Sequence, residues 1–338
     1  MHDDAIRIPW ISAAWPIDWH ATFGRPAPLA LEIGFGNGAF LLALAERRPE
    51  LDCIGIERAP SFVARVERKA AAQRLANIRV MDGDAPYLLR NLFPAHGLEE
   101  VHINFPDPWY KNAHTDRRLL QPEFLRLLAK RIRPGGLLTA ATDHPTMAEL
   151  LIRVFGDQPN FVSEFPTLYR NTAPERVART HYEAKAMAAG SEIRYFSLRL
   201  AHALPDDTVA ERVDTVPNVA FQGKFDADAF FKTFQPEASR RNIGETLVVV
   251  NYHRAFVAVA DPEWLIETTV CEGRLQQNFA LVVAARPDER WTVKTSKLGN
   301  PRPTAAVKEA VRQLAAAILK ASPTLTVVES TVGDLRSP

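Results

Sequence analysis

The sequence "LEIGFGNGAF", residues 31–40, determines the architecture expected for the first half of the chain. An apolar strand runs into three glycines at alternate positions, Gly34, Gly36 and Gly38, and a helical pattern follows. Glycines at such a turn let the backbone bend tightly and approach a ligand without a Cβ in the way. The spacing also satisfies G-x-G-x-x-A through Ala39, so the glycines by themselves leave both an NAD site and an S-adenosylmethionine site open.

Short β-rich runs alternate with helical stretches from residue 29 to residue 200. In the helical stretches, apolar residues recur every three or four positions, as in an amphipathic helix. Alternation of this kind predicts a parallel sheet covered by helices, so we expect a Rossmann-like α/β domain. The strand candidates are "LALEIG", "DCIGIE", "NIRVMD", "VHINF" and "GLLTAAT", with two more around "NFVSEF" and "IRYFSLRLA".

The character of the chain changes at residues 204–220, which are polar and acidic and have prolines near both ends. This composition predicts a linker between a first domain, 1–203, and a second domain, 221–338. The second domain begins with a series of strands in an apparently antiparallel arrangement and ends with a helix and a last strand. It therefore reads as an α+β domain.

Composition sets bounds on the function. The 338 residues are 46% apolar and 24% charged, which is typical of a globular protein. The formal net charge of +1 gives no general attraction for nucleic acid, so such a partner would need local basic patches. Two cysteines, Cys53 and Cys271, provide neither a disulfide framework nor a cysteine metal site. Without an apolar run of about 20 residues, and with acids in place of the cations of a signal peptide, the sequence predicts a cytoplasmic protein that is not in a membrane.

Acidic residues follow three successive predicted strands. Glu32 ends the first, Glu57 ends the second, and Asp84 follows the third, with Asp82 as a rival. Glu57 could accept two hydrogen bonds from a ribose diol, which suits NAD and S-adenosylmethionine equally. Glu32 could face the cationic methionine end of S-adenosylmethionine, and Asp84 or Asp82 could meet the adenine edge. Because acids follow three successive strands in this order, the sequence favours S-adenosylmethionine over NAD.

The fourth strand leads into "HINFPDPWYKNAHTDRR", residues 102–118. Ligands of open α/β sheets bind at the carboxyl ends of the strands, so this segment should face what the cofactor acts on. Asp107 stands between Pro106 and Pro108, which restrict the backbone on both sides. The pattern predicts a stiff loop that holds the carboxylate of Asp107 and the indole of Trp109 in a fixed direction.

This segment resembles the signature of the tRNA (guanine-N7-)-methyltransferases, F-P-D-P-W-x-K followed by a basic run. "LEIGFGNGAF", "GIE", "GDA", "TDH" at 142–144 and "THYE" at 180–183 fall in the family's order and spacing. The resemblance covers about residues 29–200, and the C-terminal domain resembles no family that we recognise. It implies a class I methyltransferase fold with a seven-stranded mixed sheet, S-adenosyl-L-methionine as methyl donor, and guanosine-46 in the variable loop of tRNA as acceptor.

The resemblance also implies roles for individual residues. Around the cofactor and the reacting centre it places Glu32, Gly34, Gly36, Glu57, Asp84 and Asp107. Contacts with the RNA substrate would come from Lys111, Asp143, Thr180 and Glu183. The segment 113–118 would lie against the RNA backbone through Arg117 and Arg118. Purely structural alternatives remain open for three of these residues. Thr180 and Glu183 could form a capping box, and Asp143 could be an acid at the start of a helix.

The implied reaction requires little proton transfer by the protein. Guanine N7 carries a lone pair at neutral pH, so its attack on a sulfonium methyl needs no general base and depends on alignment of the reactants. Positive charge moves to the guanine during transfer, and a carboxylate in a dry site favours that shift. Asp107 is the candidate catalytic residue, and no metal is required.

Two other function classes are compatible with parts of the sequence. A NAD-dependent dehydrogenase would keep the glycine loop and Glu57 but would have no use for residues 102–118. A non-catalytic RNA-binding module could keep the fold alone, although the acids retained at the strand ends argue against it. In the second domain, four cations near Trp291 suggest an extension of the tRNA-binding surface, with an ordinary polar hairpin as the alternative; they are Arg290, Lys294, Lys297 and Arg302. The sequence leaves open whether the protein is a monomer or a homodimer that forms through exposed strand edges.

Overall fold

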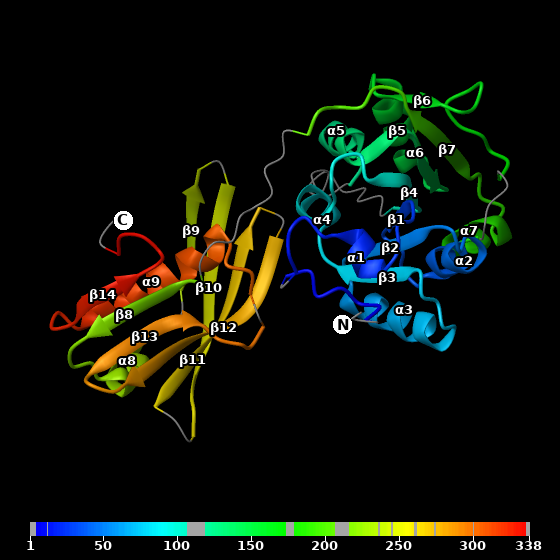
Figure 1. Cartoon of the computed structure of the whole chain (residues 1–338). Helices are drawn as coiled ribbons and strands as arrows, with labels where there is room; N and C mark the ends of the chain where they lie inside the picture. The colour runs from blue at the N-terminus through cyan, green and yellow to red at the C-terminus, as the bar shows by residue number, and fades with distance from the viewer. Residues whose placement is uncertain are drawn as a thin grey trace. The chain divides into compact units, whose positions relative to one another are not determined.

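The chain forms two compact units, Met1–Ala210 and Glu211–Pro338, in a computed structural model. The structure describes residues 5–11, 13–106, 119–173, 179–206, 216–235, 237–244, 246–259, 262–273, 275–299 and 301–335. Figure 1 labels the elements of both units. No helix in this described part of the chain combines the length and the apolar content needed to cross a membrane.

The first unit is built on a seven-stranded sheet in the order β3-β2-β1-β4-β5-β7-β6. Strands β1 to β5 are parallel, whereas β7 runs antiparallel to β5 and to β6. This confirms the predicted mixed sheet of a class I methyltransferase fold. The strands are β1 (Leu29–Ile33), β2 (Asp52–Glu57), β3 (Ile78–Asp82), β4 (Leu98–Asn104), β5 (Ile132–Thr142), β6 (Phe161–Ser163) and β7 (Arg194–Leu200).

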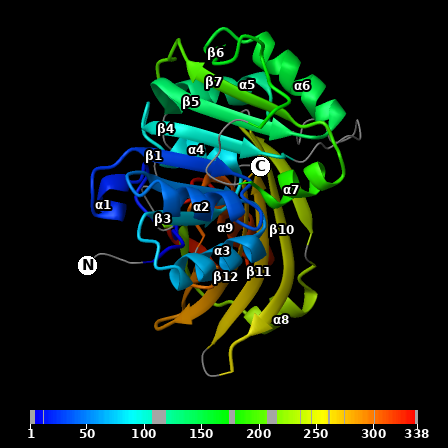
Figure 2. The same cartoon turned by 90° about the vertical axis from the view of Figure 1, so that its right-hand side faces the viewer.

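Helices cover both faces of this sheet (Figures 1 and 2). Apolar residues of α2 and α3 pack together against one face of the first three strands, where Ala30, Cys53 and Val80 are fully buried. Every residue of β1 is buried, as expected for a central strand covered on both sides. The helices of the first unit are α1 (Trp19–Phe23), α2 (Ala39–Arg47), α3 (Pro60–Ala72), α4 (Ala85–Leu92), α5 (Pro122–Arg131), α6 (Pro145–Gly156) and α7 (His181–Ala188).

The second unit is a seven-stranded antiparallel sheet in the order β14-β8-β13-β12-β11-β10-β9. This arrangement confirms the predicted antiparallel α+β domain. Its strands are β8 (Asn218–Gln222), β9 (Ala238–Ile243), β10 (Thr246–Val257), β11 (Glu263–Glu272), β12 (Leu275–Arg286), β13 (Arg290–Thr295) and β14 (Thr326–Ser330), and its helices are α8 (Ala227–Thr233) and α9 (Ala305–Ala321).

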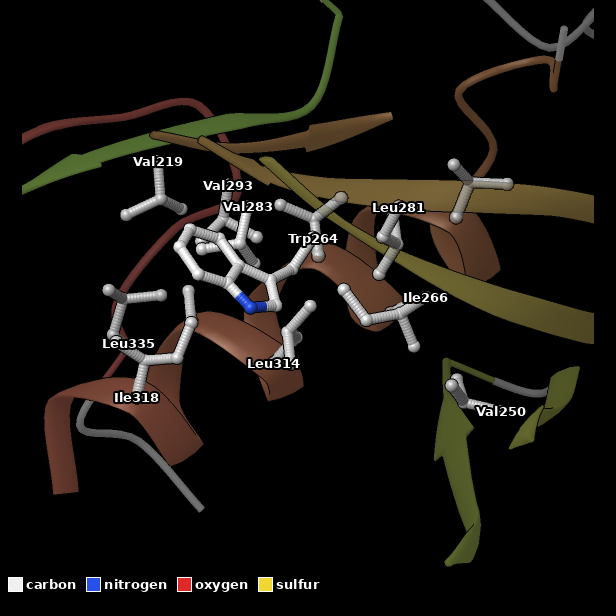
Figure 3. Packing of buried hydrophobic residues seen from close by; sticks show 14 of the residues in the cluster. Val219, Val250, Trp264, Ile266, Leu281, Val283, Val293, Leu314, Ile318 and Leu335 are labelled. Carbon is white, nitrogen blue, oxygen red and sulfur yellow. The ribbon is translucent and has the colours of Figure 1, made fainter. Parts of the chain in front are cut away.

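The core of the second unit lies between this sheet and α9. Val307, Val311 and Leu314 recur at three- and four-residue intervals along α9 and are fully buried. Figure 3 shows Leu314 and Ile318 of α9 beside Trp264 of β11. The amphipathic pattern of α9 therefore fixes the sheet face on which the core forms.

The predicted linker, residues 204–220, begins with residues that are bound to the first unit. The backbone N–H of Leu204 donates to the carbonyl of Ala129, and Asp206 forms an ion pair of 2.9 Å with the buried Arg131. At the other end, β8 begins at Asn218. We keep the division into domains 1–203 and 221–338 as a proposal.

Candidate active site

The glycine loop between β1 and α2 adopts a conformation that favours glycine. Gly34, Gly36 and Gly38 have φ angles of +76°, +52° and +78°. A Cβ on Gly38 would lie 2.3 Å from Cγ2 of Val66, so α2 starts in close contact with α3. A Cβ on Gly34 would meet no atom within 4 Å. The loop therefore combines tight packing on one side with open space on the other.

Two hydrogen bonds hold this loop against β2. The N–H of Gly34 donates to the carbonyl of Ile56 at 2.8 Å, and the N–H of Gly36 donates to Oε2 of Glu57 at 2.9 Å. Oε1 of Glu57 accepts from the N–H groups of Arg58 and Ala59, at 2.7 and 3.1 Å. Glu57 therefore lies beside the loop, and its carboxylate shapes the backbone there. A contact between Glu57 and a ribose is a further prediction.

Glu32 and Asn104 meet where the order of the strands reverses. Glu32 is the second-last residue of β1 and Asn104 the last residue of its parallel neighbour β4, and Nδ2 of Asn104 donates to Oε1 of Glu32 at 2.9 Å. The side chains are buried, with Glu32 only 1% exposed. Ligands of open α/β sheets bind at this position. The sequence analysis missed Asn104, although its place just before the F-P-D-P signature was a usable signal.

The tip of β4 carries a strained residue. Phe105 has a φ of +50°, a region that costs a residue other than glycine about 1–2 kcal/mol. It stands directly before Pro106, which restricts its backbone further. A hydrogen bond of 2.8 Å from its N–H to the carbonyl of Ala141 holds it against the end of β5. The chain thus leaves the sheet in a fixed direction immediately before Asp107.

Tyr182 connects the glycine loop to the tip of β4. Its ring stacks on Phe105 with centroids 6.5 Å apart and planes inclined by 27°. A Cβ on Gly36 would lie 4.0 Å from Cε2 of the same ring. The side chain of Tyr182 nevertheless remains 54% exposed. An accessible aromatic ring therefore lies at the end of the sheet, between the glycine loop and the chain that enters the 107–118 segment.

The start of α7 is a complete capping box. Oγ1 of Thr180 accepts from the N–H of Glu183 at 3.0 Å, and Oε2 of Glu183 accepts from the N–H of Thr180 at 3.3 Å. Glu183 is fully buried, and its Oε1 accepts a hydrogen bond of 2.9 Å from the hydroxyl of Tyr195 in β7. The capping alternative is thus confirmed. These bonds fix the helix that carries Tyr182, and a role for Thr180 and Glu183 in RNA binding is not tested by them.

The two candidate adenine-binding acids have different partners. Asp82, at the end of β3, forms an ion pair of 2.6 Å with Arg7, and its carbonyl accepts from Nε1 of Trp10 at 2.7 Å. Asp84 caps α4 by accepting from the N–H of Tyr87 at 3.2 Å. Asp82 is thus held by an ion pair and Asp84 by its cap on α4, and the contact of either acid with adenine stays a prediction.

Asp143 follows β5 and is half-buried. It is not the N-cap of α6, since that position belongs to His144, whose N–H donates to Oγ1 of Thr142 at 3.2 Å. Asp143 therefore stands at the same end of the sheet as Glu32 and Phe105, because parallel strands share their carboxyl edge. Its predicted contact with RNA is not tested by this geometry.

Comparison with known proteins identifies the family of this chain. A family model described as "Putative methyltransferase" matches residues 26–195. The tRNA (guanine-N(7)-)-methyltransferase of Thermotoga maritima is 30% identical over 305 residues, covering 89% of this chain and 92% of that protein. The protein of that name from Thermus thermophilus is 33% identical over 304 residues, with the same coverage of 89% and 92%. The chain belongs to the tRNA (guanine-N7-)-methyltransferase family.

As a member of this family the chain is an S-adenosylmethionine-dependent methyltransferase, so the dehydrogenase alternative is wrong. The second unit is shared with some relatives, because the matches of 305 and 304 residues are longer than the first unit, which ends at Ala210. Another relative, the tRNA (guanine-N(7)-)-methyltransferase of Paraburkholderia xenovorans, is 38% identical over 189 residues, covering 56% of this chain and 68% of that protein. The sequence analysis had found no resemblance beyond residue 200.

The residues present fit S-adenosylmethionine. The open side of Gly34 allows close approach of a ligand to the backbone, and Glu57 stands beside the same loop at the end of β2. A buried carboxylate, Glu32, lies at the switch point, where it suits a cationic sulfonium. Four predicted site residues lie outside the described residues: Asp107, Lys111, Arg117 and Arg118.

Proposed function

We propose that this chain transfers the methyl group of S-adenosylmethionine to N7 of a guanine in tRNA, and that guanosine-46 of the variable loop is the acceptor. The observation that carries the proposal is the contact of Tyr182 with Phe105 and its approach to Gly36. It brings the glycine loop and the chain entering the 107–118 segment to the same end of the sheet. The names of the relatives support tRNA guanine-N7 as the target.

The residues of this end of the sheet divide between two tasks in the proposal. Gly34, Gly36 and Glu57 form the cofactor side, together with Glu32 and Asp84. S-adenosylmethionine supplies an electrophilic methyl group on its sulfonium. The substrate side consists of Lys111, Asp143, Thr180 and Glu183, with Arg117 and Arg118 on the phosphates.

Alignment rather than proton abstraction drives this reaction. Guanine N7 has a free lone pair, so no residue needs to remove a proton before attack. Asp107 stabilises the positive charge that develops on the guanine, directly or through its N1–H and amino donors. The strained backbone of Phe105 directs the chain toward this residue, and the prolines on both sides of Asp107 in the sequence are expected to restrict its backbone.

Methyl transfer from labelled S-adenosylmethionine to an unmodified tRNA transcript tests the proposal, with the product base identified after digestion. We expect 7-methylguanosine, and we expect none from a transcript in which guanosine-46 is replaced by adenosine. Asp107→Ala should reduce turnover by about 100-fold or more while cofactor binding changes little. Label in another base would refute guanine N7 as the target, and full activity on the adenosine-46 transcript would refute the position.

A further inference from the structure

The second unit has a pocket that the proposed function does not use. It has a volume of about 570 Å³ and lies where the chain passes from β8 into α8. Three aromatic side chains and three charged ones line it: Phe225, Trp264, Trp291, Lys224, Asp226 and Asp228. All of them lie within the described part of the second unit, so the pocket can be considered by itself.

The aromatic walls are held by packing. Trp291 lies 5.8 Å from Trp264 with planes inclined by 44°, and 5.0 Å from Phe225 at 85°, measured between ring centroids. Phe231 of α8 stacks against Trp264 at 6.1 Å and 15°. Trp264 reaches into the core shown in Figure 3, whereas Trp291 is only half-buried. Two indoles and a phenyl ring therefore form a preorganised wall with an accessible part.

This arrangement corrects the earlier interpretation of Trp291. Side chains alternate along β13, so Arg290 and Lys294 point to the opposite face of the sheet from Trp291. Arg290 donates to Gln222 there, and Arg302 is buried at 7% exposure. The expected ring of cations around Trp291 is therefore wrong. The charges that do accompany Trp291 in the pocket are mainly negative.

Carboxylates dominate the rim of the pocket. Asp226 is fixed because its Oδ1 accepts from the N–H of Ala229 at 2.9 Å, as the N-cap of α8. Asp228 is exposed two residues later, and Lys224 is exposed before Phe225. Aromatic faces attract cations, and nearby carboxylates strengthen that attraction. A simple anion would instead face two carboxylates for one ammonium group.

We propose that this pocket binds a cationic, N-alkylated purine nucleotide, represented by 7-methylguanosine 5′-monophosphate. The inference rests on the proposed function, whose product carries this base. Alkylation at N7 spreads a positive charge over the purine, which suits the half-buried indole of Trp291, whereas Trp264 is buried behind it and holds the wall in place. The N1–H and amino donors of guanine suit a carboxylate such as Asp228, and the phosphate suits Lys224. Each chemical part of the nucleotide thus has a counterpart in the lining.

Charge is the property by which the pocket discriminates. Guanosine 5′-monophosphate has the same ring, the same donors and the same phosphate but lacks the positive charge on the base. The pocket is therefore a product-recognition site, and it binds the modified base more tightly than the unmodified one.

Calorimetric titration of the full chain with the two nucleotides, at mildly acidic pH, tests this inference. We expect the methylated nucleotide to bind about fivefold more tightly than guanosine 5′-monophosphate, the gain expected of a partly exposed cation–π contact. Trp291→Ala should weaken binding of the methylated nucleotide about tenfold or more, as loss of a stacking ring does. Trp291→Phe keeps a ring in the core and should retain part of the affinity.

Matched variants separate the pocket from general effects on the unit. Asp228→Asn should weaken the methylated nucleotide about threefold to fivefold and guanosine 5′-monophosphate by a smaller factor, because both bases donate to the carboxylate but only the cation also gains from its negative charge. Asp288→Asn, at the turn after β12, and Phe256→Ala, an exposed ring of β10, should bind both nucleotides as the wild type does. Equal affinity for the two nucleotides, or wild-type binding by both Trp291 variants and Asp228→Asn, overturns the inference.

Methyl transfer to tRNA by the same variants keeps the two proposals apart. If Trp291→Phe forms 7-methylguanosine in tRNA but the pocket variants bind the nucleotide normally, the pocket proposal falls and the proposed function stands. If the nucleotide binding pattern is as expected but the labelled base is another one, the function falls and the binding site stands. Titration with methylated and unmethylated tRNA then tells whether the ligand is carried by RNA or free.

Discussion

Replacing Gly34 by alanine separates the backbone role of this glycine from its role beside the cofactor. The φ of +76° costs an alanine about 1–2 kcal/mol, and the smaller entropy of the unfolded chain returns about 0.4–1 kcal/mol. The new methyl group meets no protein atom within 4 Å, so overpacking adds nothing. We expect a net loss of about 1 kcal/mol in the free energy of unfolding, which lowers Tm by about 2–4 °C in a unit of this size.

The same methyl group would stand in the open space beside Gly34, where the proposed function brings the cofactor close to the backbone. We therefore expect Gly34→Ala to weaken S-adenosylmethionine binding by about tenfold or more, although the fold is kept. Gly190→Ala is the matched control, because its φ is +68° and a Cβ there also meets nothing within 4 Å. It should lower stability equally and leave cofactor affinity unchanged.

Gly38→Ala provides the opposite case. Its Cβ would lie 2.3 Å from Val66, so an overpacking cost of about 1–3 kcal/mol is added to the backbone cost. Thermal unfolding measures the stability of the three glycine variants, and calorimetric titration measures their affinity for S-adenosylmethionine. If Gly34→Ala binds S-adenosylmethionine as tightly as Gly190→Ala does, the loop does not approach the cofactor and the reasoning fails.

Three further predictions concern side chains around the site and in β4. Tyr182→Ala should raise the KM for tRNA about tenfold while calorimetry shows cofactor affinity nearly unchanged, and Tyr182→Phe should behave as wild type because the ring is kept; equal loss in both variants would contradict stacking. Tyr195→Phe should lower the free energy of unfolding by about 1–3 kcal/mol, since it removes a donor to a buried carboxylate, and unchanged denaturant midpoints would count against this. The hydrogen bond from His102, helped by the nearby charge of Arg48, holds the pKa of Glu100 below its ordinary value although burial of the carboxylate opposes this, so the stabilisation is full above about pH 4.3 and is lost as the pH falls further. Glu100→Gln should therefore flatten the acid limb of the stability curve, whereas Glu123→Gln, in an exposed pair, should not.

Local patterns allowed much of the fold and part of the site to be predicted. The glycines, the strand ends and the Thr180–Glu183 spacing each depend on residues a few positions apart, so their structures could be read directly. The parallel part of the sheet followed from the alternation of strands and helices, and the mixed seven-stranded sheet followed from the family resemblance. The family resemblance added the cofactor and the reaction, which periodicity alone left open.

Long-range contacts could not be predicted in this way. The pairing of Asp82 with Arg7 joins residues 75 positions apart, and that of Glu32 with Asn104 joins residues 72 positions apart. No local signal in the sequence states that Arg7 returns to the end of β3. The face on which Trp291 lies was also missed, because it depends on the register of β13 against β8. Such contacts determine which partner each of several similar acids has.

The anchoring of the glycine loop has a consequence for the thermodynamics of cofactor capture. Its N–H groups are already tied to Ile56 and Glu57, so the loop needs no ordering when a small molecule arrives. Little conformational entropy is then surrendered by this segment on association, and the encounter should follow a single kinetic phase. Selection between donor and spent cofactor must accordingly arise from charge at the sulfur rather than from a change in the shape of this loop.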